Sequence, residues 1–217
     1  MTDVKAVAGD GHQTPRKWYA RWRVAAAVAA VAVLAAAATL VVLHSRMPKP
    51  AGNELAEAEP YGWHAAKDVG TVFTDGLNLV TVSDGARGAL RLVSAKPLMD
   101  GGGTLRVLGV LARVNPDMLP PGHTTGWFQD SPGFPPSRHD DAGGVDVKSL
   151  VVRPPATGED RWIEIQIGYE VIAEGRSARR GVELIYEYEG ETKRAFIPSY
   201  LAICAPATAS CEPEYDD

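Results

Sequence analysis

The sequence predicts a mainly β protein in which a single N-terminal transmembrane helix precedes one antiparallel β-sandwich. Residues 24–43 form an unbroken apolar run, and several later segments alternate apolar with polar residues between turns that contain glycine or proline. A period of two is typical of strands with one buried face. About six or seven such strands, with no amphipathic helix among them, favour a sandwich, and an open barrel is the alternative.

The apolar run predicts a helix that crosses a membrane once. At a rise of about 1.5 Å per residue, residues 24–43 make a helix whose length matches the roughly 30 Å hydrocarbon core of a bilayer. The apolar part of a cleaved secretion signal is shorter and ends at a small-residue cleavage site, whereas this run continues into the sequence HSRMP. A buried helix of a soluble domain would carry a polar face, and only Thr39 interrupts this one.

The charges that flank this helix orient it. Four basic residues lie close before it: Arg16, Lys17, Arg21 and Arg23. Only Arg46 and Lys49 follow it closely, before a group of glutamates. Because cytoplasmic flanks are rich in lysine and arginine, residues 1–23 are expected to be a cytoplasmic tail and the later part of the chain to lie outside the plasma membrane. The lipid bilayer is then the expected partner of residues 24–43.

Charge also limits the functions of the outer part. Residues 1–49 hold seven Lys and Arg against two Asp and Glu, and residues 50–217 hold fifteen against twenty-five, a net charge of −10. So acidic a part of the chain argues against binding to nucleic acid. Within it, the prolines and glycine of residues 44–60 indicate a juxtamembrane linker, and residues 61–204 have the length of one domain.

The strands of this domain follow from alternation and turn residues. The clearest is residues 163–171, in which apolar and polar residues alternate throughout. Residues 182–188 and 192–198 predict a hairpin, because Gly190 between them supplies the backbone freedom of a tight turn. Four further segments have the character of strands: residues 77–82, 89–94, 104–114 and 147–153.

Five glutamates lie on the polar faces of the predicted strands or at the hairpin turn: Glu164, Glu170, Glu183, Glu187 and Glu189. Alternation places them away from the core, so we expect them on a solvated surface. Carboxylates that act as a general acid and a general base need unequal environments, which a shared solvated face does not provide. No catalytic residue is therefore assigned to this group.

The chain holds two cysteines, Cys204 and Cys211, and both lie on the side predicted to be extracytoplasmic. In an oxidising compartment such a pair is expected to form a disulfide. This bond would fasten the end of the last strand to the C-terminal tail, residues 205–217. A zinc site would need further soft ligands close by, and no metal or cofactor is assigned.

Residues 115–146 form the least regular part, a long connection rich in proline and glycine. Long loops on a rigid scaffold often carry function. Three of its aromatic residues are candidate partner contacts: Trp127, Phe128 and Phe134. The alternative is that the loop only covers one edge of the sandwich. Its histidines, His123 and His139, lack the spacing of a metal or nucleophile motif, so neither kind of site is assigned.

A resemblance to known proteins rests on the pattern of five segments: residues 75–80, 87–93, 105–110, 182–188 and 201–204. The first two match a hairpin, the third matches the next strand, and the last two match the end of the domain. Together with the arginine-containing tail and the Ala-rich anchor, this layout resembles that of uncharacterised single-pass membrane proteins of high-GC Gram-positive bacteria. The resemblance implies a small immunoglobulin-like sandwich outside the membrane and supplies no catalytic residue.

These features favour a membrane-tethered interaction or structural module of the cell envelope. Such a module would present a sheet face or the loop of residues 115–146 to another envelope protein, and an enzyme is not expected. The alternative is an envelope enzyme, or a ligand- or metal-binding domain, that uses the histidines and aspartates of the same loop.

Overall fold

The structure is a computed structural model that describes residues 32, 33, 35, 47–115, 129–138, 143–156, 159 and 161–212. The chain divides into two units, Met1–Met47 and Pro48–Asp217. The predicted cytoplasmic tail and nearly all of the predicted transmembrane helix lie outside the described residues. Among the residues that are described, no helix is long and apolar enough to cross a membrane.

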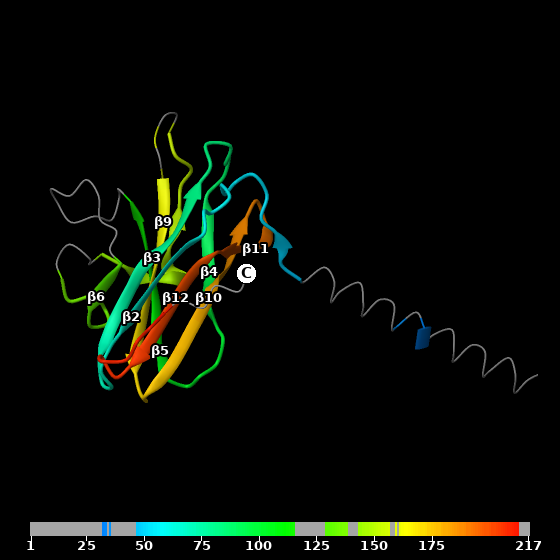
Figure 1. The fold of residues 1–217 in the computed structure, drawn as a ribbon. Helices are drawn as coiled ribbons and strands as arrows, with labels where there is room; N and C mark the ends of the chain where they lie inside the picture. Colours follow the sequence, from blue (N-terminus) through cyan, green and yellow to red (C-terminus); the bar gives the residue numbers. More distant parts are fainter. Residues whose placement is uncertain are drawn as a thin grey trace, which may run out of the picture. The chain divides into compact units, whose positions relative to one another are not determined.

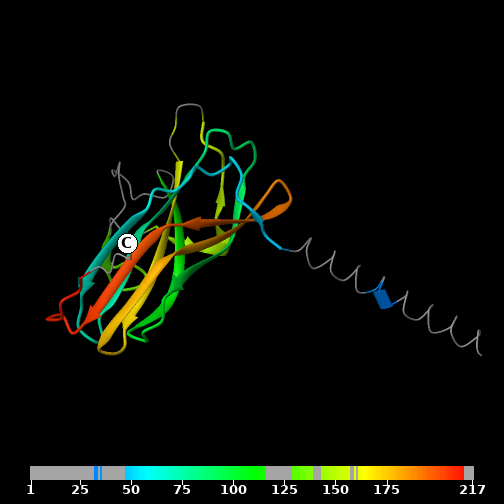
Figure 2. The ribbon, with the colours of Figure 1, turned by 45° about the vertical axis from the view of Figure 1, so that its right-hand side comes forward.

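The second unit consists of strands in two sheets, which Figures 1 and 2 show from two directions. Sheet A contains β1 (Lys49–Pro50), β2 (Tyr61–Ala66), β4 (Leu90–Met99), β8 (Val151–Val152), β10 (Gly175–Tyr188), β11 (Glu191–Ile197) and β12 (Ser199–Ala205). Sheet B contains β3 (Val72–Val82), β5 (Leu105–Asn115), β6 (Asp130–Pro132), β7 (Val145–Asp146) and β9 (Arg161–Val171). The prediction of a mainly β fold is confirmed, and the described residues of this unit form no α-helix.

The long strand β10 organises sheet A. It pairs antiparallel with β4 on one side, and on the other side its first part pairs with β12 and its second part with β11. The two short N-terminal strands extend this sheet in parallel, β1 beside β11 and β2 beside β12. Sheet B has the order β6-β3-β9-β5-β7 and is antiparallel throughout.

Both sheets contribute to one hydrophobic core. The apolar residues of the predicted strand 163–171 are fully buried in it: Ile163, Ile165, Ile167, Tyr169 and Val171. Sheet A supplies the facing members of the same cluster: Val182, Leu184, Tyr186, Leu201 and Ile203. Each buried side chain of this size stabilises the fold by about 1.5 to 3 kcal/mol, so the alternation that predicts these strands also accounts for how the sheets pack.

The hairpin predicted around Gly190 is confirmed. Strands β10 and β11 pair from Val182↔Ile197 to Tyr188↔Glu191, which leaves Glu189 and Gly190 as the two turn residues. Their φ angles are 50° and 78°. A two-residue turn with positive φ at both positions matches the twist of the strands that it joins.

The first hairpin implied by the resemblance, residues 75–80 with 87–93, is wrong. The first of these segments lies in β3, which pairs with β6 and β9 in sheet B, and the second contributes to β4, which pairs with β8 and β10 in sheet A. Consecutive strands with one buried face can pair or pass to the facing sheet, because either choice buries the same side chains. The predicted strand 147–153 is also shorter, since Val147–Ser149 is a 3-10 turn capped by Asp146.

The predicted linker, residues 44–60, is partly built into the fold. We call residues 49–60 the strap. Its β1 pairs with β11, and Leu55 is buried and bridges to Val82 of β3. The strap therefore contacts both sheets before β2 begins, so the predicted linker is packed against the fold from Lys49 onward.

The expectation of a solvated carboxylate face is wrong for Glu164. Its side chain does point away from the core, but it is buried and pairs with the buried guanidinium of Arg113 on β5. Part of the 115–146 connection lies over this face of sheet B, with Gly144 close to the Gln166 side chain and Phe134 close to Gly168. Alternation predicted the direction of Glu164 but not the cover above it.

Candidate functional site

The structure describes one of the three aromatic residues predicted to contact a partner. Trp127 and Phe128 lie outside the described residues, whereas Phe134 is half-buried and its ring lies over Gly109 and Gly168. These two glycines are opposite each other on β5 and β9, and a Cβ atom at Gly168 would overlap the ring. The contacts of Phe134 are thus with its own sheet, where an aromatic ring covers the space that paired glycines leave.

The described parts of the 115–146 connection are fastened to sheet B. β6 pairs with β3, and Thr74 donates a hydrogen bond of 2.5 Å to the carbonyl oxygen of Gly133. Asp130 pairs with Lys67, whose ammonium also lies 4.7 Å from the centre of the Phe73 ring. His123 and His139 are outside the described residues. Within the described part of the chain, no three His, Cys, Asp or Glu side chains are grouped as a metal site.

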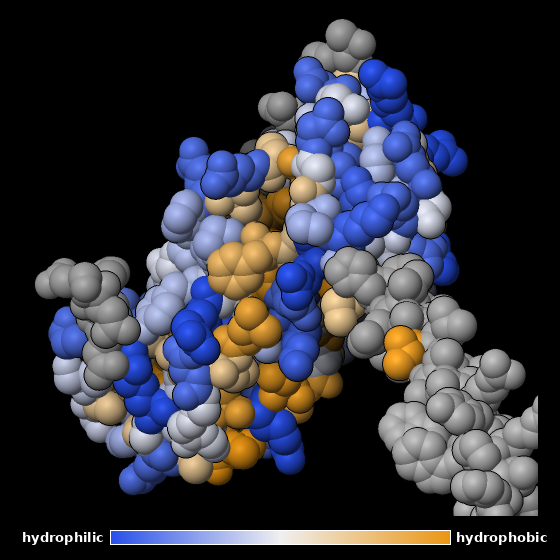
Figure 3. All heavy atoms as spheres, turned by 90° about the vertical axis from the view of Figure 1, so that its right-hand side faces the viewer, coloured by the Kyte–Doolittle hydropathy of each residue, from blue (hydrophilic) through white to orange (hydrophobic). Residues whose placement is uncertain are grey.

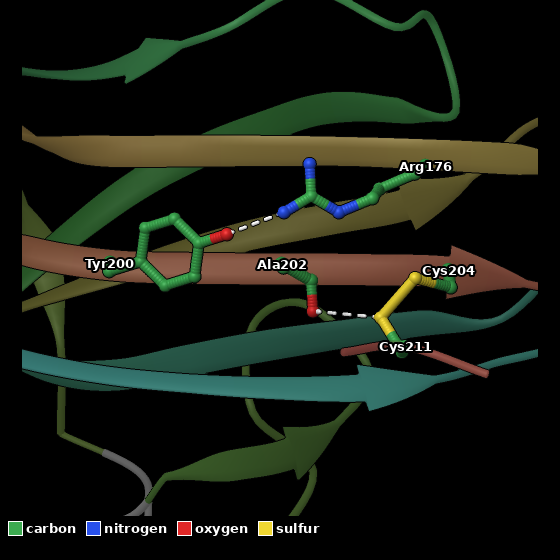
Figure 4. Close-up of a disulfide and its surroundings, with 5 residues drawn as sticks. All are labelled: Arg176, Tyr200, Ala202, Cys204 and Cys211. Carbon is green, nitrogen blue, oxygen red and sulfur yellow. Dashed lines mark hydrogen bonds between the residues drawn. A yellow bond between two sulfur atoms is a disulfide. The ribbon is translucent and has the colours of Figure 1, made fainter. Parts of the chain in front are cut away.

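Cys204 and Cys211 form a disulfide, as predicted (Figure 4). Cys204 is buried at the end of β12, and the Cα atoms of the pair lie 5.5 Å apart. The Sγ atom of Cys211 lies 3.8 Å from the carbonyl oxygen of Ala202, and the N–H of Ala207 donates a hydrogen bond of 3.0 Å to Asp68. The chain that follows β12 is thereby held against β12 and the segment that follows β2.

The disulfide predicts a loss of stability when it is removed. A closed loop this short is expected to contribute about 2.5 kcal/mol, through the restricted unfolded state. Cys211→Ser should lower the free energy of unfolding by about that amount in urea titrations, while Ser210→Ala should leave it unchanged. An unreduced peptide covering residues 202–212 should have the mass of the oxidised form. Free thiols in protein from the native envelope would contradict both the bond and the predicted compartment.

A polar cluster lies in the core between the two sheets. Its six members are buried side chains, and we call them the inter-sheet cluster: Trp63, Asp75, Asn78, Tyr169, Arg179 and Ser199. Three come from β2, β10 and β12 of sheet A, and three from β3 and β9 of sheet B. Buried charges and polar groups need partners because an unpaired one costs several kcal/mol.

Asp75 is the centre of this cluster. One carboxylate oxygen accepts a hydrogen bond of 2.9 Å from the indole of Trp63. The other accepts one of 2.8 Å from Asn78 and pairs with the guanidinium of Arg179. The carboxylate is therefore bound on both oxygens, and the ion pair joins a strand of sheet A to a strand of sheet B.

Arg179 and Ser199 complete the connections. The guanidinium donates hydrogen bonds to the hydroxyl of Tyr169, at 3.2 Å, and to the carbonyl oxygen of Ser199, at 3.0 Å. The hydroxyl of Ser199 donates to the side-chain oxygen of Asn78 at 2.6 Å. Each member thus binds at least one member on the facing sheet, which suits a role in fixing how the sheets pack.

The ionisation of the cluster favours the same role. Burial raises the pKa of Tyr169 to about 12, because the nearby Arg179 only partly offsets it and Asp75 adds to it. Burial lowers the pKa of Arg179, but Asp75 and Tyr169 more than compensate, so it is raised overall. At neutral pH the phenol stays protonated and the guanidinium stays charged. Neither group exchanges a proton near neutrality, as a general acid or base would.

The sequence contains one signal for this cluster, which is the position of its polar residues along β3. Asp75 is two residues from the buried Phe73 and so lies on the same face of β3. After the bulge that follows Asp75, Asn78 likewise shares the face of the buried Val80. A polar residue in phase with core positions of a strand indicates a buried hydrogen-bonding partner. Arg179 gave no comparable signal, since it lies in the polar sequence RSARRG.

Another buried carboxylate, that of Glu54, fixes the strap. Only 1% of this residue is exposed. Its oxygens accept hydrogen bonds from the hydroxyl of Tyr186 at 2.5 Å, the N–H of Gly52 at 3.0 Å and the ammonium of Lys193 at 3.1 Å. Burial raises its pKa, but these donors and its own backbone N–H outweigh burial and lower the pKa to about 2. Glu54 is therefore ionised and bound at neutral pH.

Comparison with known proteins gives a structural similarity at low sequence identity. No family model matches the sequence, and no curated protein does. Among solved structures, the CooA pilin subunit from enterotoxigenic Escherichia coli is similar at a TM-score of 0.34 and 10% identity, over 70% of this chain and 97% of the pilin subunit.

Proposed function

We propose that this protein is a membrane-tethered module of the cell envelope whose outer domain acts by structure and protein interaction. Residues 24–43 would anchor it in the plasma membrane, with residues 1–23 in the cytoplasm. The observation that carries the proposal is the apolar run with a basic N-terminal flank, followed by a disulfide-closed β domain. Disulfides persist outside the reducing cytoplasm. The bond and the charges that flank the helix therefore both favour an extracytoplasmic location for the β domain.

Three further features support an interaction or structural role. The inter-sheet cluster and Glu54 engage their charged groups in holding sheets and strap together. The antiparallel arrangement within sheet B and the core shared with sheet A support an immunoglobulin-like sandwich.

In Figure 3 apolar side chains gather in a band between polar ones on one face of the domain, which is a feature of contact surfaces. Trp127, Phe128 and Phe134 remain candidate contacts of the 115–146 connection.

Cysteine labelling tests this proposal. In whole cells, a membrane-impermeant maleimide should label Glu214→Cys and should not label Thr14→Cys until the membrane is opened. The physical reason is that the predicted helix separates the two positions and that the basic flank stays in the cytoplasm. Labelling of Thr14→Cys in intact cells would reverse the orientation, and labelling of both sites would show that the chain does not span the membrane.

A further inference from the structure

One edge of sheet B is only partly covered. On the side of β3 that faces away from β9, β6 pairs with residues 73–75, and the strap meets the other end of the strand, where Leu55 bridges to Val82. Between these two contacts, no described strand pairs with β3. An open edge of this kind presents unpaired backbone groups to any extended chain that reaches it.

The register shows which backbone groups are open. The N–H of Ala56 donates to the carbonyl oxygen of Thr81 at 3.0 Å, so the backbone of Thr81 points away from β9. Backbone groups alternate in direction along a strand, and therefore those of Leu79 point the same way, whereas the bulge between Asp75 and Asn78 interrupts the alternation at Leu77. Among the described residues, no strand pairs with either leucine on that side.

A groove lies along this open edge. It has a volume of about 380 Å³, and Leu77 and Leu79 form one wall. Tyr61 and the junction between β11 and β12, which includes Ile197 and Pro198, form another wall. The third wall is strap residues 57–59, beyond which a second groove of about 560 Å³ continues. The groove offers apolar side chains beside backbone groups that pair with no described strand.

The rim of the groove is acidic. Glu57 and Glu59 are exposed, and neither forms an ion pair with a described residue. The part of the chain after residue 49 carries a net charge of −10. A basic occupant is therefore favoured by charge. The acidic C-terminal residues 213–217, or a second copy of this chain, would be repelled.

We propose that this groove binds a short extended segment of a partner protein that carries alternating apolar and basic side chains. Its backbone would pair with that of Leu79 and so add a strand to sheet B, as in other strand-addition complexes. Its apolar side chains would enter the groove, and a lysine or arginine would lie against Glu57 and Glu59. The inference deepens the proposed function, because it gives the interaction module a surface and a class of partner.

Synthetic peptides test the groove on purified full-length protein in detergent. The probe is the capped hexapeptide KVKVKV, with EVEVEV and a fully N-methylated KVKVKV as matched controls. Addition of KVKVKV should shift the amide signals of Leu77 and Leu79, which both line the groove, and should slow the hydrogen exchange of Leu79. The glutamate peptide should not bind. N-methylation should weaken binding by about tenfold or more, because it removes backbone hydrogen bonds worth about 1 kcal/mol each.

Matched protein variants test the charge. The double variant Glu57→Lys/Glu59→Lys should weaken KVKVKV by about tenfold at low salt. Glu174→Lys changes an exposed carboxylate in the β9–β10 turn, outside the groove, and should leave binding unchanged.

Three results would overturn the inference. They are absence of KVKVKV binding, equal binding of the glutamate peptide, and a concentration-dependent dimer whose contact protects Leu79, which would make a second copy the occupant. The cysteine labelling in cells does not depend on the groove, so the location and the groove can fail separately.

Discussion

Replacing Arg179 by methionine is expected to lower the free energy of unfolding by about 3 to 5 kcal/mol, the usual result of removing one partner of a buried ion pair. The guanidinium is buried and is bound to Asp75, Tyr169 and Ser199. Without it, Asp75 keeps a buried negative charge with only neutral donors. The loss is large relative to the 5 to 15 kcal/mol that stabilises a typical domain, and urea titration of the purified protein measures it.

The neighbouring residue supplies the control. Arg180 is exposed and pairs with Asp100 at the surface, so Arg180→Met should cost less than about 1 kcal/mol. In the double variant Asp75→Leu/Arg179→Met, part of the loss should return, because no unpaired charge remains in the core. Equal losses for Arg179→Met and Arg180→Met would show that the inter-sheet cluster does not hold the sheets together.

The strands of this protein are largely predictable because burial imposes a period of two on their sequences. The run around Ile165 and the hairpin around Gly190 show this, since each side chain there faces the side that its parity requires. The disulfide of Cys204 and Cys211 was predictable for a different reason, which is that the chain offers only one pair.

Strand partners and outer cover were not predictable. The sequences of β3 and β4 alternate in the same way whether the two strands pair in a hairpin or lie in different sheets. The pattern therefore did not show that β3 belongs to sheet B and β4 to sheet A. The strap lacks alternation because it contacts the fold through a few side chains, Glu54 and Leu55 above all. Glu164 was misplaced for a related reason, since a connection distant in sequence covers its face of the sheet.

Glu54 connects the strap to both sheets, and the part of this connection made by its side chain depends on the carboxylate being ionised. Its side chain binds Tyr186 and Lys193 of sheet A, and its carbonyl oxygen accepts a hydrogen bond of 3.0 Å from the N–H of Ser83, just after β3. Glu54 thus binds both sheets a few residues after the domain begins at Pro48. The ionised carboxylate therefore helps to keep the strap in place beside the groove of β3, together with β1 and Leu55.

Acid should release this contribution. The folded-state pKa of Glu54 is about 2, below the 4.5 of an ordinary glutamate carboxyl. The carboxylate therefore stabilises the fold at pH values above the pKa that Glu54 has in the unfolded chain. The contribution, about 3 kcal/mol, is complete above roughly pH 5 and is lost progressively as the pH falls toward 2. Glu54→Gln should remove it at neutral pH and should flatten the pH dependence of urea unfolding between pH 5 and 3.

The exposed Glu57 of the same strap is the matched control for Glu54. Glu57→Gln makes the same chemical change without a buried partner, so its unfolding free energy should follow that of the original protein at every pH. Tyr186→Phe should fall between the two, because it removes one hydrogen bond to Glu54 and leaves the pair with Lys193. If Glu54→Gln and Glu57→Gln retain the same acid dependence, the strap is held by apolar contacts such as those of Leu55, and the carboxylate does not control it.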